Sequence, residues 1–377
     1  ADEALRIAES GNLKLISGTA DRPNDMLNTI GDIELTWGGY QYRNPEALMM
    51  VKEGDGQKIL RTLIPPYIDP HPGLTSANNG TYGDVCLGAS MKMVEMFYTA
   101  HGLPISEDMQ WVDSRYSLSK ENNTSYQHIV PLGENILSLH RLREPRFYAI
   151  IGADRTYWYR YTLDQKYDDV LIRNRQGEWG GTELNKIDES VKQNITGYWV
   201  KKWMAPYLPL QGYASRSNPY NTKVMFRLPD LLLASAEAWN EYLDQPDERV
   251  YGPLDQVRQR AGILPVRQAW KNYAKNPDRV DTQAGMREII QQEWNIEFAF
   301  ESRRFWNLRR WMTAPQELNS PQYGWNVLAS DEAGFYNNFE GPIPVWKKRS
   351  FIAPRDYFFP IRAEEIFISG VVQNPGW

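Results

Sequence analysis

Two glutamates, Glu297 and Glu301, lie four residues apart in the stretch EFAFESRRFWNLRRW, which spans residues 297–311. On a helix this spacing separates the two Cβ atoms by about 5–6 Å, close to the carboxyl separation of retaining glycosidases. The two carboxylates of a glycosidase, however, flank the substrate from opposite sides of a cleft. Two acids on one helical turn, surrounded by arginine and tryptophan, are better suited to forming salt bridges.

An apolar stripe with helical spacing runs through the same stretch. From Ile290 onward, apolar side chains recur every three or four residues, and Glu301 fills the one gap; the stripe comprises Ile290, Trp294, Phe298, Phe305, Leu308 and Met312. A buried carboxylate must be paired with a cation, because an unpaired buried charge is strongly destabilising. Possible partners are Arg258, Arg260, Arg303, Arg304 and Arg309. We predict a structural clamp of Glu297, Glu301 and Arg304 and no catalytic residue.

Composition and motifs exclude several other classes of function. The chain has 377 residues, a net charge of −5 and a single cysteine, Cys86, so it has neither an internal disulfide nor a basic field for nucleic acid. The four histidines form no HExxH motif, and no GxSxG motif or phosphate-binding glycine loop occurs. We predict a protein that is not an enzyme and that needs no metal, no cofactor and no nucleic acid.

The first residues, ADEALRIAESGNLKLISG, read as a helix that ends near Gly11. They contain neither the basic region nor the apolar region of a signal peptide. No run in the chain approaches the roughly 20 apolar residues of a membrane span. We therefore expect that the native N-terminal portion is not part of this chain.

Helical periodicity is strong at 90–100, 226–242, 250–261 and 285–312. The segment 143–225 contains short alternating runs that indicate a few strands, and 313–360 is rich in proline and loops. The pair of helices that starts at 226 has the size of one tetratricopeptide unit. Five aromatic residues are predicted to lie in the core: Tyr198, Trp199, Trp239, Trp294 and Trp306.

Several blocks of the sequence resemble the SusD/RagB family of outer-membrane nutrient-binding lipoproteins. REIIQQEWNIEFAFESRRFWNLRRW is similar to the family's signature helix, although Ser302 replaces a glycine and Asn307 an aspartate. FRLPDLLLASAEAWNE, with Pro229 in place of alanine, and LDQVRQRAG resemble two upstream helices. LREPRFYAIIG, with Glu144 in place of aspartate, TGYWVKKW and the C-terminal FPIRAEEIFISGVVQNPGW resemble three further blocks.

The resemblance implies a mostly α fold, in which tetratricopeptide-like helix pairs form a scaffold with long irregular loops and a few short strands. It implies one domain over 1–377 without its N-terminal portion, with the clearest helix pairs at 226–312 and a loop-rich C-terminal segment at 313–377. Such a protein is anchored at the cell surface of the outer membrane through a lipidated N-terminal cysteine, which this chain does not contain. Its partner is a SusC-like TonB-dependent transporter, and its ligand is an oligosaccharide or, in some branches, a peptide.

Aromatic rings among polar residues are typical of sugar-binding surfaces, because sugars offer apolar C–H faces and a rim of hydroxyl groups. The first candidate is TWGGYQYRN, which supplies Trp37, Tyr40, Gln41, Tyr42, Arg43 and Asn44. The second is TYWYRY, which supplies Tyr157, Trp158 and Tyr159. Each segment could instead fold onto the scaffold. A glycan binder, a peptide binder and a glycan-active enzyme remain open from the residues themselves.

Overall fold

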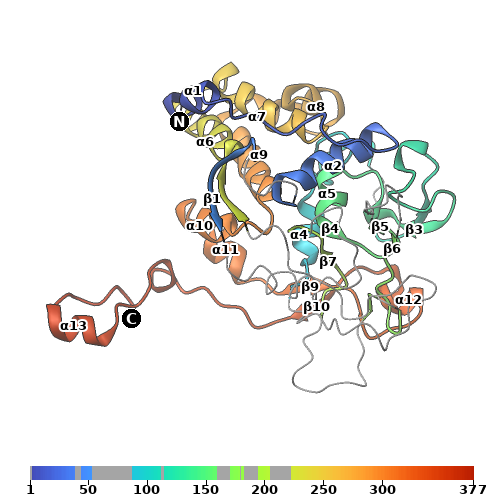
Figure 1. Cartoon of the computed structure of the whole chain (residues 1–377). Coiled ribbons are helices and arrows are strands. Elements are labelled where there is room, and N and C mark those ends of the chain that lie inside the picture. The colour runs from blue at the N-terminus through green and yellow to red at the C-terminus, as the bar shows by residue number, and fades with distance from the viewer. Residues whose placement is uncertain are drawn as a thin grey trace.

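A computed structural model of the chain describes residues 2–38, 44–52, 87–111, 114–158, 170–178, 180–181, 194–203 and 222–377. Its helices are α1 (Asp2–Ser10), α2 (Asp25–Gly38), α4 (Met91–Met96), α5 (Pro145–Ile150), α6 (Leu228–Tyr242), α7 (Glu248–Arg260), α8 (Val266–Tyr273), α9 (Gln283–Glu297), α10 (Arg303–Arg310), α11 (Ala314–Leu318), α12 (Glu332–Phe335) and α13 (Ala363–Ser369). The strands are short and form two-stranded antiparallel sheets. Figure 1 shows this arrangement, and the prediction of a mostly α fold is confirmed.

Among the described residues there are five strand pairs. They are β1 (Ala47–Lys52) with β8 (Thr222–Arg227), β2 (Leu118–Lys120) with β3 (Asn135–Leu137), β4 (Ile151–Gly152) with β7 (Trp199–Val200), β5 (Tyr157–Trp158) with β6 (Val170–Leu171), and β9 (Gln322–Gly324) with β10 (Ile343–Trp346). Of these, β1–β8 and β4–β7 join segments that are distant in the sequence. Because β8 leads directly into α6, the β1–β8 pair connects residues near 47 to the start of the helical scaffold.

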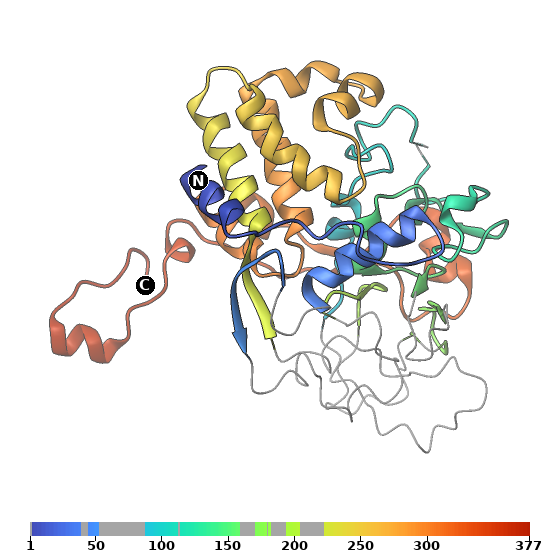
Figure 2. The ribbon, with the colours of Figure 1, turned by 45° about the horizontal axis from the view of Figure 1, so that its top comes forward.

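Helices α6 to α9 pack around one core, and α1 lies against α6 (Figure 2). The small residue Ala236 is fully buried on α6, which allows neighbouring helices to approach closely. At the start of α6, the Asp230 carboxylate accepts a hydrogen bond of 2.9 Å from the Arg227 backbone N–H. After α7 the chain turns at Gly262, whose φ of +72° favours glycine. These caps explain why the predicted helices at 226–242 and 250–261 appear at nearly those positions.

A second core lies under α2, α4 and α5 and is rich in aromatic residues. Arg143, which precedes α5, is fully buried there. Its guanidinium donates to the backbone carbonyls of Val94, Phe97, Tyr98 and Leu139 at 2.6–3.2 Å. It thereby satisfies carbonyl groups at the C-terminal end of α4, which is shorter than the predicted helix at 90–100. Burial lowers the pKa of Arg143 to about 10.

The predicted helix at 285–312 is interrupted between α9 and α10. Phe300 and Ser302 adopt left-handed backbone conformations, with φ of 61° and 64°. The turn changes the direction of the chain, so the apolar stripe does not continue. Trp306 is 58% exposed and Met312 62% exposed, and the prediction that Trp306 belongs to the core is wrong. Of the other predicted core aromatics, Trp239 is half-buried and the rest are buried: Tyr198, Trp199 and Trp294.

The C-terminal arm, residues 355–377, projects from the body of the molecule (Figure 1). The Gln373 side chain links the two ends of the arm, because it accepts a hydrogen bond from the Ile361 N–H at 2.8 Å and donates one to the Ile361 carbonyl at 2.9 Å. Asn374 donates to the Phe359 carbonyl, and the Trp377 indole donates to the Arg355 carbonyl. The C-terminal QNPGW residues therefore hold the end of the arm against residues 355–361. In the described parts of the chain, no helix has the length and apolar character to cross a membrane.

Candidate functional site

Glu297 and Glu301 lie in a buried network of charges. Glu297 accepts hydrogen bonds from Arg146, at 3.2 Å, and from Arg227 and Arg260. Glu301 accepts from the Lys202 ammonium at 2.5 Å and from Arg227 at 2.8 Å. The side chains of the two glutamates are 1% and 8% exposed. Neither carboxylate is placed to meet a substrate from solvent.

The network extends beyond the two glutamates. Arg146 also binds Glu144 and Glu293, at 2.7 and 2.6 Å. Arg258 binds Glu293, and Arg227 reaches Glu46. The charge network therefore consists of five carboxylates and five cations: Glu46, Glu144, Glu293, Glu297, Glu301, Arg146, Lys202, Arg227, Arg258 and Arg260.

Burial by itself would raise the pKa of Glu297, but Arg260, Arg227 and Arg146 outweigh burial and hold the pKa well below its ordinary value. The pKa of Glu301 is also lowered, because Arg227 and Lys202 outweigh its burial. Both carboxylates are thus ionised at neutral pH. A general acid needs a carboxyl group with a raised pKa, so this pair does not have the properties of a glycosidase acid.

The predicted place of Arg304 in the clamp is corrected by the structure. Arg304 follows the left-handed turn and donates to Asn295 Oδ1 at 2.8 Å and to Glu317. It contacts neither of the clamp glutamates within the described residues. Arg227 and Lys202 occupy that role. They lie in the blocks FRLPD and TGYWVKKW, which were recognised in the sequence but not as sources of partners for Glu301.

The first aromatic candidate segment is partly described. Trp37 is half-buried, and the Lys202 ammonium lies 4.9 Å from the centre of its ring. Asn44 is buried and donates to the Thr36 carbonyl at 2.8 Å while accepting from the Glu46 N–H at 2.9 Å. The amide of Asn44 is therefore committed to the scaffold, which corrects its predicted ligand contact. Four of the predicted contacts lie outside the described residues: Tyr40, Gln41, Tyr42 and Arg43.

The second aromatic candidate segment forms β5. Trp158 is only 5% exposed, and the Lys201 ammonium lies 5.9 Å from its ring centre. Its ring is part of the scaffold, which corrects its predicted ligand contact. Tyr157 is half-buried, and its backbone N–H donates to the Ile129 carbonyl. Tyr159 lies outside the described residues.

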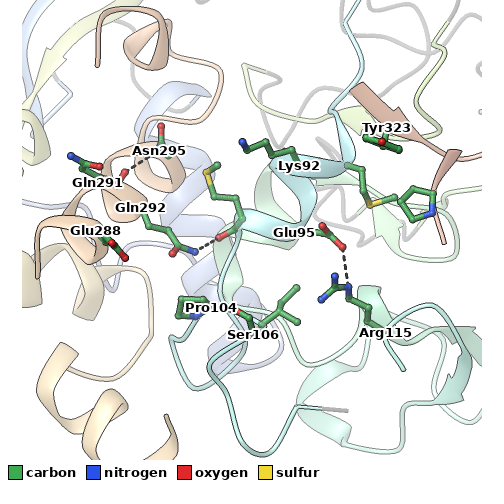
Figure 3. Close-up of a pocket in the computed structure, with 14 residues that line it drawn as sticks. Lys92, Glu95, Pro104, Ser106, Arg115, Glu288, Gln291, Gln292, Asn295 and Tyr323 are labelled. Carbon is green, nitrogen blue, oxygen red and sulfur yellow. Dashed lines mark hydrogen bonds and ion pairs between the residues drawn. The ribbon is translucent and has the colours of Figure 1, made fainter. Parts of the chain in front are cut away.

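A groove of about 770 Å³ lies between α4 and α9 (Figure 3). Its apolar lining comprises Met91, Met96, Pro104, Ile105 and Pro342, and its polar lining comprises Lys92, Glu95, Ser106, Arg115, Glu288, Gln291, Gln292 and Asn295, with Tyr323 on the β9 side. The volume falls in the range of ordinary ligand sites. The combination of a ring, amides and charges over an apolar lining can hold a polar ligand with apolar faces.

One face of α9 forms a wall of the groove. Glu288, Gln291, Gln292 and Asn295 have the spacing of neighbours on a helix surface. Gln292 donates to the Met96 carbonyl at 2.8 Å and thereby fixes the distance between α9 and the end of α4. Gln291 also lines the groove, and within the described residues its side chain makes no hydrogen bond. This polar stripe is visible in the sequence, but we did not interpret it as a binding surface.

The opposite wall carries a fixed ion pair. Arg115 binds Glu95 at 3.0 Å, and the Tyr116 hydroxyl donates to the same carboxylate at 2.7 Å. Tyr323 is 41% exposed on β9. Its neighbour Gly324 is required there, because a Cβ atom would lie 2.7 Å from the Cα of Thr196. The aromatic ring thus lies on a strand pair, β9 with β10, that is closely packed against Thr196.

No cluster of histidine, cysteine, aspartate and glutamate that could hold a metal ion occurs among the residues that the structure describes. The fold is mostly helical, and its groove is open and has polar walls. The model of the SusD family matches residues 49–377, and the chain belongs to this family. SusD-like proteins are binding proteins associated with the outer membrane at the cell surface. No match to a curated protein was found.

Solved structures share the fold at low sequence identity. BT4246 is 20% identical, with a TM-score of 0.76, and the match covers 100% of this chain and 61% of that one. The SusD-like protein BF3747 from Bacteroides fragilis NCTC 9343 is 21% identical, with a TM-score of 0.66, and the match covers 100% and 61%. The SusD-like carbohydrate-binding protein BF0978 from the same strain is 18% identical, with a TM-score of 0.58, and the match covers 97% and 59%. The chain therefore spans roughly 60% of the length of these structures.

Proposed function

We propose that this protein captures an oligosaccharide at the cell surface and that the groove between α4 and α9 holds part of it. The observation that carries the proposal is the groove itself, in which the amide of Gln291 and the exposed ring of Tyr323 accompany an apolar lining. Sugar rings bind to aromatic faces through their C–H groups and to amides through their hydroxyl groups. Membership of the SusD family supports the same conclusion.

Calorimetry with a panel of oligosaccharides tests the proposal. Tyr323→Ala should weaken binding by about 1–3 kcal/mol, by analogy with the loss of an aromatic stacking platform. Trp346→Ala is the matched control, because Trp346 lies on the paired strand β10, is 55% exposed and does not line the groove. Equal effects of the two substitutions on affinity would remove the groove from the proposal.

A peptide ligand is the alternative, and the partly buried Met96 in the groove favours it, since a thioether adapts to varied apolar side chains. The same calorimetry with peptide mixtures separates the two ligand classes. A glycan-active enzyme would be detected by a reducing-sugar assay on the purified protein. Release of reducing ends from a bound glycan would overturn the role as a pure binder.

Residues of the two candidate segments outside the groove remain proposed contacts. They are Trp37, Tyr40, Gln41, Tyr42, Arg43, Tyr157 and Tyr159. Trp37 can offer only its open side, because Lys202 covers part of the ring. Trp37→Ala should weaken binding if this segment contacts the ligand. Unchanged affinity with earlier melting would assign Trp37 to the scaffold alone.

We further propose that the full-length protein is lipid-anchored and works with a SusC-like TonB-dependent transporter in the outer membrane. Family membership supports this arrangement. Opening would expose the binding groove, and closing would trap the ligand between the two proteins. A pull-down of the full-length protein from gently solubilised outer membranes should recover a barrel-sized companion. Recovery of the protein alone would leave a surface binder without a transporter.

A further inference from the structure

The C-terminal arm, residues 355–377, exposes a series of large apolar side chains to solvent. Phe367, Ile368 and Val372 are 92%, 79% and 88% exposed. Figures 1 and 2 both show α13, which carries Phe367 and Ile368, at the far end of the arm and away from the body. The other exposed apolar residues of the arm are Phe358, Phe359, Val371 and Trp377. Such a group of neighbouring exposed apolar side chains is typical of an interaction site.

Hydrogen bonds within the arm keep α13 away from the body of its own chain. The Gln373 side chain binds both backbone groups of Ile361, and the Trp377 indole donates to two carbonyls at the start of the arm. These bonds close the arm into a loop with α13 between its two ends. The base of the loop is fixed to the body, because Tyr357 packs edge-on against Phe351, which is buried beside α10. The exposed side chains of α13 therefore face another molecule.

A second exposed apolar surface lies on α10, next to the base of the arm. The ring centres of Phe305 and Trp306 are 4.9 Å apart, and Phe305 stacks with Phe359 of the arm at 6.3 Å. These three rings are 42%, 58% and 59% exposed. The Arg309 guanidinium lies 3.6 Å from the centre of the Phe305 ring. Phe305, Trp306 and Arg309 are called the α10 face. Aromatic residues and arginine are the types that are enriched at protein interfaces.

The arm and the α10 face carry opposite charges. Glu364 and Glu365 lie exposed in the first turn of α13, and within the described residues neither forms an ion pair. With Arg362 at the N-cap, the helix keeps a net negative charge. Arg309 donates to two backbone carbonyls and forms no ion pair in the described part of the chain. An acidic, apolar helix thus complements a basic, aromatic surface of the same chain.

We propose that a second copy of this chain covers the arm and that the two copies exchange their arms. In this dimer, α13 of each copy lies on the α10 face of the other. The dimer has two-fold symmetry and contains the same contact twice. Once the first arm has docked, the second docks within the same complex, so two modest contacts give one stable dimer. None of the residues of the arm or the α10 face lines the groove, so the dimer does not depend on the proposed function.

Sedimentation equilibrium of the complete chain over a concentration series tests the proposal, and the wild type should form dimers. Phe367→Glu on the arm and Trp306→Glu on the α10 face should each raise the dimer dissociation constant about tenfold or more, because each places a charge within an apolar interface. Ile7→Glu is the matched control, because Ile7 is 57% exposed on α1, outside the arm and the α10 face. The urea midpoint of each variant verifies that the monomer remains folded.

A mixture of the two variants distinguishes arm exchange from other dimers. Each variant alone loses both contacts, since either every arm or every α10 face is altered. A mixed dimer keeps one contact, between the unaltered arm of the Trp306→Glu chain and the unaltered α10 face of the Phe367→Glu chain. An equimolar mixture should therefore contain more dimer than either variant alone at the same total concentration.

Three outcomes would overturn the inference. The first is a wild type that stays monomeric at every concentration, whether its arm folds onto its own chain or binds a lipid surface. The second is a wild-type dissociation constant in either Phe367→Glu or Trp306→Glu, which would place the contact elsewhere. The third is a mixture with no more dimer than the separate variants, which excludes arm exchange. Glycan binding in the groove is independent of all three outcomes.

Discussion

Replacement of Glu301 by glutamine tests whether the charge network is a structural clamp. The substitution keeps the shape of the side chain and removes its charge. Lys202 then loses its carboxylate partner, while its side chain remains 0% exposed. Arg227 keeps Glu297 and Glu46. The variant therefore places one uncompensated charge, that of Lys202, in the protein interior.

The expected cost is a fall of about 3–5 kcal/mol in the free energy of unfolding, the range for breaking a buried ion pair. Burial already lowers the pKa of Lys202, and Glu301 opposes this effect. Without Glu301, the pKa of Lys202 should fall further. The folded variant then loses the Lys202 proton more readily than the unfolded chain does, so its stability should recover as the pH rises.

Urea denaturation followed by tryptophan fluorescence measures this free energy. Glu241→Gln is the control, because Glu241 and Arg287 form an exposed pair, 44% and 39% exposed, which should contribute at most about 1 kcal/mol. Lys202→Met in the Glu301→Gln background should restore much of the loss. A loss in Glu301→Gln no larger than in Glu241→Gln would refute the reasoning. Glycan turnover by the wild type that disappears in a normally stable Glu301→Gln variant would do the same.

Three further predictions concern pH, backbone strain and the C-terminal arm. Burial lowers the pKa of His140 to about 3, so only the unfolded chain binds a proton at this imidazole as the pH falls from about 6.5. The free energy of unfolding should therefore fall by about 5 kcal/mol towards pH 3. An equally steep fall in a pH series on the His140→Gln variant would contradict this prediction. Ser302 has φ of 64°, so Ser302→Gly should raise the unfolding free energy by about 1 kcal/mol by relieving left-handed strain, and a lower urea midpoint would be the opposing result. Gln373→Ala removes both hydrogen bonds to Ile361. Proteolysis within the arm should therefore accelerate, while the global free energy of unfolding changes by less than about 0.5 kcal/mol. Unchanged proteolysis would show that these hydrogen bonds do not hold the arm together.

Helix pairs were predictable because their signals are local. Pro229 at the start of α6, Asp247 as the cap of α7 and Gly262 after α7 each act within a few residues of the boundary they set. The break after α9 was not predicted, because Phe300 and Ser302 carry no local preference for left-handed conformations. The related family pattern has glycine where this chain has Ser302, so the substitution removes the one residue type that signals such a turn.

The candidate site was harder to predict than the fold. Aromatic content pointed to segments 37–44 and 157–159, but sequence cannot distinguish a ring that covers the scaffold from one that faces a ligand. Trp158 illustrates this, because β5 places its ring in the interior. The groove between α4 and α9 joins residues almost 200 positions apart, such as Lys92 and Gln291. No local sequence pattern indicates that these residues lie close together.

The charge network explains why the family could be recognised while the ligand could not. Its members come from separate sequence blocks: Arg146 from LREPRF, Lys202 from TGYWVKKW, Arg227 from FRLPD and Arg258 from LDQVRQRAG, and all meet the glutamates of the signature helix. Since an unpaired member of the network would be costly, these blocks must keep compatible charges together. The groove has no comparable internal constraint. Lys92, Gln291 and Tyr323 lie outside the matching positions of these blocks and are open to solvent, so their identities can follow the ligand and not the fold.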